Sequence, residues 1–342
     1  MSLFFKSPLD IEVLLDGEES RKHVEVPNNT ASDTKALRDR LPLYEDGESI
    51  SGIVTLRVKE GKRVEHLGVK VSVIGSIDMI RTHGNGNGGS SKRLTNSSSG
   101  LSDARKNSVE QFLCFSYDLC PAGELQHSQS YNFMFKDLAK RHESYRGKNV
   151  DVSYYVKVTV IRKAADITKL KKFWVYLYNN VSLPPTSVVN QRQIENGEEN
   201  GLVRNEPKPV KLDIGIENCL HIEFEYSKSQ YSLKEVIVGR IYFLLTRLKI
   251  KHMELSLIAR ESSGLQPSNY LIDSTVIRYE IMDGSPVKGD TIPIRLFLGG
   301  YELTPDMSCN YFNIKNYLSL VIIDEDGRRY FKQSEIVLYR SR

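Results

Sequence analysis

SISGIVTLRV (49–58), followed by EHLGVKVSVIG (65–75), returns in the second half of the chain as VIVGRIYFLL (236–245), followed by KHMELSLI (251–258). Later segments repeat in the same order. These are SYNFMF (130–135) with IPIRLFL (292–298), VSYYVKVTVIR (152–162) with NYLSLVIIDE (316–325), and KKFWVYLY (171–178) with FKQSEIVLYR (331–340). An ordered series of matches predicts two copies of one structural unit.

The repeated segments are short, rich in Val, Ile, Tyr and Phe, and separated by Gly, Asp and Pro, which is typical of β-strands. Gly52 and Gly239 occupy equivalent positions, as do His66 and His252, so we expect a shared structural role for each pair. No segment has a convincing long amphipathic helix pattern, and the nearest candidate, residues 137–145, could form one or two turns at most. The sequence therefore predicts an all-β protein made of β-sandwiches.

Two polar segments interrupt the strand pattern. Residues 84–108 are nearly all Gly, Ser, Asn and charged residues, and we interpret them as a flexible insertion. Residues 183–209 are polar and bracketed by prolines, as in a linker. The predicted organisation is an N-terminal sandwich over 1–182, a mobile connection over 183–209 and a C-terminal sandwich over 210–342.

Composition narrows the class of partner. The chain has 342 residues with 47 Lys and Arg against 43 Asp and Glu, a net charge of +4, which does not favour a nucleic-acid partner. Four cysteines without paired spacing indicate buried thiols in a reducing compartment. The first residues do not form a secretory signal, and the longest apolar run is interrupted by Arg240 and Arg247. We expect a cytoplasmic protein that reaches membranes through partners.

No segment supports catalysis, and no cofactor is expected. His221, Glu223 and Glu225 alternate along one strand and share a face, which superficially resembles a metal or acid–base site. We favour the interpretation that the intervening apolar residues fill the core while these three face water. The segment DEDG (324–327) indicates a hairpin turn, and the basic run 57–66 indicates a solvated hairpin around Gly61, with acidic lipid headgroups as the alternative.

Binding surfaces are better indicated. Ile281 and Met282 are consecutive at the end of a predicted strand, and neighbouring strand residues point to opposite faces, so at most one should enter the core. The other should be exposed, either as an interface residue or as a stray surface side chain. Tyr330 and Phe331 present the same geometry, so one of these rings should also leave the core.

The sequence closely resembles the vacuolar protein sorting-associated protein 26 family, the arrestin-like subunits of the retromer complex. The resemblance covers nearly the whole chain outside 84–108 and 183–209. The motifs that carry it are DGESISG (46–52), GKRVEHLGVKV (61–71), the block 214–258, YEIMDGSPVKGDTIPIRLFLGGY (279–301) and DEDGRRYFKQSEIVLYR (324–340).

The resemblance implies an arrestin-like fold of two β-sandwich domains packed end to end. It also implies a non-catalytic role in endosome-to-Golgi transport of transmembrane cargo, peripheral on the endosome membrane. The loop EIMDGSPVKG would dock on the large α-solenoid retromer subunit, with Ile281 and Met282 as apolar anchors and Pro286 and Val287 stiffening or flanking the loop.

The resemblance implies a second site near the domain junction. There the family binds a sorting nexin and takes the cytosolic tails of cargo by strand addition. Ile214, on the strand LDIGIE, and Phe331 would form the walls of its pocket, with Ile214 standing where the family pattern has valine.

Two other readings remain open at this point. The chain could be an arrestin-related adaptor that recruits a ubiquitin ligase, because Leu41-Pro42-x-Tyr44 resembles a ligand for WW domains. It could also be a β-sandwich enzyme or carbohydrate-binding protein, which would require a convergent metal site at His221, Glu223 and Glu225.

Overall fold

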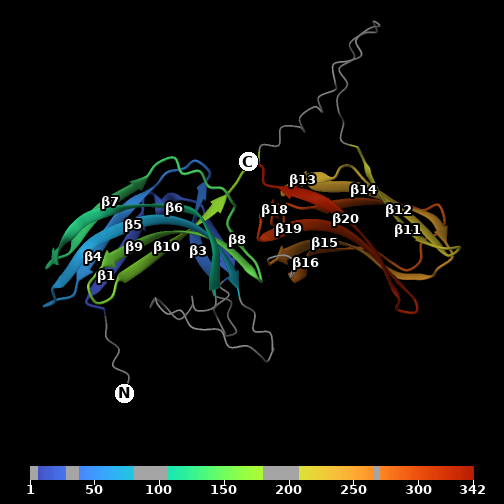
Figure 1. Cartoon of the computed structure of the whole chain (residues 1–342). Helices are drawn as coiled ribbons and strands as arrows, with labels where there is room; N and C mark the ends of the chain where they lie inside the picture. Colours follow the sequence, from blue (N-terminus) through green and yellow to red (C-terminus); the bar gives the residue numbers. More distant parts are fainter. Residues whose placement is uncertain (1–6, 28–37, 81–105, 180–207, 265–269) are drawn as a thin grey trace, which may run out of the picture. The chain divides into compact units, whose positions relative to one another are not determined.

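The structure is a computed structural model that describes residues 7–27, 38–80, 106–179, 208–264 and 270–342 (Figure 1). The chain divides into two compact units, Met1–Leu177 and Tyr178–Arg342. Within the described ranges the only helix is the short 3-10 helix η1 (Glu18–Ser20), so the all-β prediction is confirmed. Residues 84–105 of the expected insertion and 183–207 of the expected connection lie outside the described residues.

The first unit contains two sheets, one of three strands in the order β1-β4-β7 and one of seven in the order β2-β3-β10-β9-β5-β6, with β8 added to β9. The strands are β1 (Leu9–Leu15), β2 (His23–Pro27), β3 (Arg38–Glu45), β4 (Ile50–Val58), β5 (Val64–Ile80), β6 (Lys106–Leu125), β7 (Gln129–Phe135), β8 (Tyr145–Arg146), β9 (Val150–Ile161) and β10 (Ile167–Tyr176).

The second unit contains a four-stranded sheet in the order β11-β12-β14-β17 and a six-stranded sheet in the order β13-β20-β19-β15-β16, with β18 added to β19. The strands are β11 (Val210–Ile216), β12 (Leu220–Tyr226), β13 (Gln230–Ser232), β14 (Val236–Thr246), β15 (Ile250–Ser263), β16 (Tyr270–Asp283), β17 (Thr291–Phe297), β18 (Met307–Ser308), β19 (Phe312–Asp324) and β20 (Arg329–Tyr339).

The strand orders confirm the duplication. The run β1-β4-β7 corresponds to β12-β14-β17, and β3-β10-β9-β5-β6 corresponds to β13-β20-β19-β15-β16. In both units the last long strand pairs in parallel with an earlier strand, β10 with β3 and β20 with β13. Each repeated segment of the sequence therefore occupies the same place in its own sandwich.

Gly52 and Gly239 are glycines for the same physical reason, which is the lack of space for a side chain. A Cβ atom on Gly239 would lie 2.5 Å from the carbonyl oxygen of Glu225 and 2.8 Å from the ring of Phe224, on the neighbouring strand β12. At Gly52 the obstacles are the carbonyl oxygen of Leu14 on β1 and the ring of Phe133. Each glycine lets an adjacent backbone approach the strand closely.

Each unit has its own core between its two sheets. In the first, side chains of β1, β4 and β7 pack against those of β5, β9 and β10. In the second, β11, β12, β14 and β17 pack against β15, β19 and β20. In the four-stranded sheet, β12 alternates buried and exposed residues. The residues that recur with a period of two along this strand are therefore the ones that enter the core.

Several local expectations are wrong. Residues 137–145 form no helix, and the turn at Gly61 joins β4 to β5, which belong to different sheets, so it closes no hairpin. Lys106–Ser108, placed in the insertion, belong to β6 and pair with β5.

His66 and His252 differ in environment, because His66 is buried and His252 is partly exposed. None of the four cysteines is buried; all are free and two are exposed.

Candidate functional site

A β-bulge lies at the end of β16. Met253 of β15 pairs with Met282, but the next residue, Glu254, pairs with Glu280, so Ile281 is the extra residue of β16. A bulge interrupts the strict alternation of side chains between the two faces of a strand. It lies immediately before the loop that connects β16 to β17.

The bulge changes the expected exposure of the anchors. Ile281 and Met282 are both partly buried, and both pack against the core of the second unit. The expectation that one of them leaves the core assumed regular alternation, which the bulge removes. Neither side chain is fully sequestered, so both contribute part of their apolar surface to the outside of the molecule.

The loop after the bulge is tied down at both ends. At its start, the amide of Gly284 donates to the carbonyl of Lys251 at 2.8 Å, and the amide of Ile250 donates to the Ser285 hydroxyl at 2.7 Å. At its end, the amide of Gly289 donates to the carbonyl of Phe243 at 2.7 Å. A loop held this way presents its side chains with little loss of conformational entropy on binding.

Pro286 and Val287 face opposite environments at the tip of this loop. Pro286 is buried, whereas Val287 is 68% exposed. The amide of Val287 donates to the Asp290 carboxylate at 2.8 Å, which fixes the turn beneath the side chain. Of the four residues assigned to this loop from the sequence, Val287 is thus the one most open to a partner.

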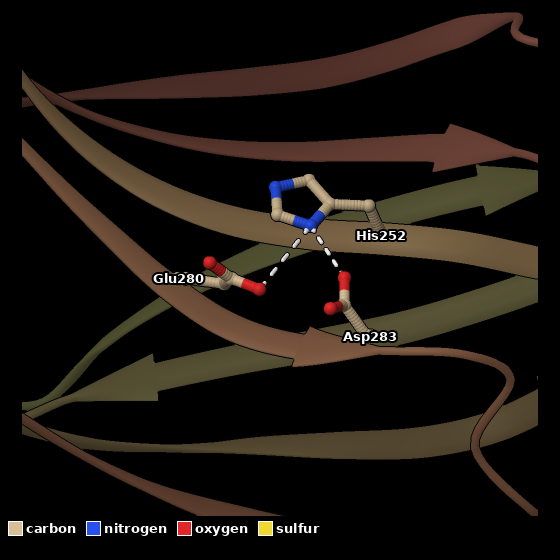
Figure 2. A group of neighbouring side chains, drawn as sticks. All are labelled: His252, Glu280 and Asp283. Atoms are coloured by element: carbon tan, nitrogen blue, oxygen red, sulfur yellow. Dashed lines mark hydrogen bonds and ion pairs between the residues drawn. The ribbon is translucent and has the colours of Figure 1, made fainter.

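A polar cluster that the sequence did not predict borders the bulge. The Nδ1 atom of His252 lies 3.0 Å from Oδ1 of Asp283 and 3.8 Å from Oε1 of Glu280, and Figure 2 shows both carboxylates on the same side of the ring. The hydrogen bond with Asp283 raises the pKa of His252 above its ordinary value. The contact with His252 in turn lowers the pKa of Asp283.

The second predicted site lies at the edges of two strands. β11 pairs with β12 on one side and with no other described strand, and β20 pairs with β13 only from Val337 onward. β11 and β20 lie next to each other although they belong to different sheets. Among the described strands, the second unit therefore has two neighbouring edges without a partner strand, one along β11 and one along the first part of β20.

The two residues assigned to this site differ in exposure. Ile214 is only 7% exposed and belongs to the core, whereas Phe331 is 60% exposed on β20. Its neighbour Tyr330 packs against the core, and its hydroxyl donates to Asp324 at 3.1 Å. The expectation that one of the two rings leaves the core is confirmed, and that ring is Phe331.

The structure removes the support for the metal-site reading of β12. Leu220, Ile222, Phe224 and Tyr226 are buried, and the alternating residues face outward. Lys211 lies 2.7 Å from Glu223 and 3.3 Å from Glu225, so both carboxylates already have a cationic partner. His221 is 3.9 Å from Asp213 and is exposed.

The WW-ligand reading loses its support as well. Leu41-Pro42-x-Tyr44 lies within β3, and Tyr44 is 1% exposed in the core of the first unit. A WW domain binds an accessible proline-rich segment, which this strand does not provide. Within the described residues, no helix has the length and apolar character needed to cross a membrane.

The two β-sandwiches of matching topology define an arrestin-like protein. The particular family follows from comparison with known proteins. The family model for vacuolar protein sorting-associated protein 26 matches residues 5–327, and the chain belongs to this family.

Named relatives agree with the family assignment. The chain is 65% identical to the carboxypeptidase Y-deficient protein 8 of Saccharomyces cerevisiae, with both chains covered completely. It is 41% identical to the vacuolar protein sorting-associated protein 26 of Schizosaccharomyces pombe, covering all of this chain and 99% of the relative. It is 40% identical to the human vacuolar protein sorting-associated protein 26B, covering 99% of this chain and 88% of the relative.

Proposed function

We propose that this protein is a non-catalytic scaffold and adaptor subunit of retromer that acts in endosome-to-Golgi transport of transmembrane cargo. The observation that carries the proposal is the family match over residues 5–327. The protein would be cytoplasmic and peripheral on the endosome membrane, reached through its partners. The loop and strand edges of the second unit supply surfaces suited to binding polypeptides.

The loop after β16 is the proposed docking surface for the large α-solenoid subunit. Val287 supplies an exposed apolar side chain, and the partly exposed surfaces of Ile281 and Met282 lie at the bulge before it. Pro286 is buried and stiffens the tip. Small apolar anchors on a rigid support bind well because their burial is favourable and little ordering entropy is lost.

Replacing Val287 with aspartate should weaken binding of the solenoid subunit by about tenfold or more, because an apolar contact is exchanged for a charge that must be desolvated. Val287 is 68% exposed, so the fold should be unaffected. The measurement is the Kd of the full chain for the purified solenoid subunit by isothermal titration calorimetry, with the melting temperature measured in parallel.

Leu271→Asp is the matched control, because Leu271 lies at the opposite end of β16 and is 64% exposed. This variant should bind like the wild type. Equal affinities for the wild type and Val287→Asp would show that this loop is not the docking surface.

The edge of β11, beside β20, is the proposed site for cargo tails together with a sorting nexin. An added strand obtains backbone hydrogen bonds from the edge, and nearby side chains select its sequence. Phe331 is exposed on the neighbouring strand β20 and would contact an apolar cargo residue, while Ile214 of β11 lies in the core. Each contact is weak, so affinity would come from several subunits acting together.

Phe331→Ala should reduce the affinity for a cargo-tail peptide in the presence of the sorting nexin several-fold, because a large ring is lost from the pocket wall. Fluorescence anisotropy of a labelled tail peptide measures this. Val337→Ala is the control, because Val337 is also exposed on β20 but lies where β13 already pairs with the strand. Unchanged affinity in Phe331→Ala would remove this residue from the site.

A further inference from the structure

We propose that His252, Glu280 and Asp283 form a binding site for a divalent transition-metal cation, and that Zn²⁺ is the ion that suits it best. The three side chains come from the paired strands β15 and β16 of the second unit (Figure 2). One ligand atom from each lies within 4.8 Å of the others. Histidine nitrogen and the carboxylate oxygens of Asp and Glu are all ligands that zinc takes in proteins.

The two distances from His252 to the carboxylates are close to those of a zinc site. Bonds of roughly 2.0–2.2 Å in tetrahedral geometry place neighbouring ligand atoms about 3.3 Å apart. The Nδ1 atom of His252 lies 3.0 Å from the Asp283 carboxylate and 3.8 Å from the Glu280 carboxylate, so the two distances bracket this value. Small rotations of two exposed carboxylates would complete three of the four tetrahedral positions and leave the fourth for water.

The bulge creates this arrangement. In a regular strand, residues three apart point to opposite faces, so Glu280 and Asp283 could not both approach one side chain of β15. The extra residue Ile281 shifts the register between them, and both carboxylates then face His252. A bound cation would join β15 to β16 across the bulge that carries Ile281 and Met282.

The local charge favours a cation. Among the described residues, His252 is the only basic group within 4.0 Å of either the Glu280 or the Asp283 carboxylate. This contrasts with Glu223 and Glu225, which share Lys211. The two carboxylates near His252 are therefore incompletely neutralised, and a divalent ion would balance them while replacing the proton on Nδ1.

The second nitrogen of the ring also has a partner. The Nε2 atom of His252 lies 3.7 Å from Oε2 of Glu254, whose side chain is 9% exposed and 3.5 Å from Arg278. A carboxylate on the far nitrogen of a ligating histidine fixes the ring orientation and the tautomer. Glu254 is beyond hydrogen-bond distance in this structure, and a shift of a few tenths of an ångström would let it take this role in the proposed site.

The test is a zinc titration of the tag-free full chain after EDTA treatment and removal of the chelator, followed by isothermal titration calorimetry. The wild type should bind one Zn²⁺ at this site, and His252→Ala should weaken binding by about 100-fold or more, since even loss of a residue that only supports a ligand costs about 10–100-fold. Asp283→Asn should weaken it as well. Co²⁺ in place of Zn²⁺ should give visible absorption bands of a tetrahedral site that His252→Ala abolishes.

His221→Ala is the matched control. His221 is an exposed histidine near the carboxylate of Asp213, but among the described residues it does not belong to a group of three possible metal ligands. This variant should bind zinc like the wild type. Absence of zinc binding by the wild type, or equal affinity in the wild type and His252→Ala, would overturn the proposal. The test involves none of the proposed binding partners, so its failure would leave the proposed function untouched.

Discussion

The full chain carrying Ile281→Asp together with Met282→Asn is expected to lose more than 100-fold in affinity for the large α-solenoid subunit. Well-packed apolar anchors contribute about 2 kcal/mol or more each when truncated at an interface, and about 1.4 kcal/mol corresponds to tenfold. Aspartate and asparagine would also carry polar groups into the interface. A pulldown and a calorimetric Kd with the purified solenoid subunit measure the loss.

The same substitutions are expected to lower the stability of the second unit without unfolding it, because both side chains pack against its core but remain partly exposed. Thermal unfolding separates the two effects. Val287→Asp should lose affinity at unchanged melting temperature, since Val287 makes no part of the core. Wild-type affinity in a folded double variant would place the anchor elsewhere on the molecule.

The duplication was predictable because strand segments with a buried face carry a period of two that survives in each copy. Gly52 and Gly239 were the strongest markers, since the close approach of a neighbouring backbone excludes a side chain at both positions. The histidines were weaker markers. His66 and His252 occupy equivalent strands, yet their surroundings differ, because side-chain packing is not duplicated with the backbone.

The bulge at Ile281 was not predictable from the sequence. The residues around it read as a regular strand, and only the pairing of Met253 with Met282 and of Glu254 with Glu280 reveals the extra residue. Its consequence is chemical as well as structural, because it places Glu280 and Asp283 on one side of His252. Proximity of residues on two strands depends on register, which a list of residues along one strand does not contain.

At the predicted sites, the exposure of some side chains could be predicted from strand alternation, whereas the exposure of others depends on tertiary contacts. Tyr330 and Phe331 point to opposite faces of β20, as neighbouring strand residues do, so one exposed ring could be expected. The burial of Pro286 and the exposure of Val287 depend on a loop held by hydrogen bonds to residues of β14 and β15. Such tertiary contacts leave no local signature in the sequence.

Lys140→Met is expected to destabilise the first unit by about 3 kcal/mol. Lys140 is 2% exposed, and its ammonium group donates to the carbonyl oxygens of Glu45 and Glu48 at 2.7 Å and of Leu138 at 3.3 Å. Methionine would fill the space but remove this charged donor from partly buried carbonyls, of which Leu138 keeps the amide of Gly47 and Glu45 keeps the amide of Glu48. Hydrogen bonds from a charged group contribute about 1.5–3 kcal/mol each, and the loss is partly offset by apolar burial. Urea unfolding measures the change.

Lys136→Met is the matched control, since Lys136 is exposed four residues earlier, and its stability should stay within about 0.5 kcal/mol of the wild type. A comparable loss in both variants would contradict the role assigned to the buried ammonium.

The contacts of Lys140 also explain why residues 137–145 form no helix. The side chain folds back onto the turn between β3 and β4, and one ammonium bound to three carbonyls holds the segment in an irregular, non-helical conformation.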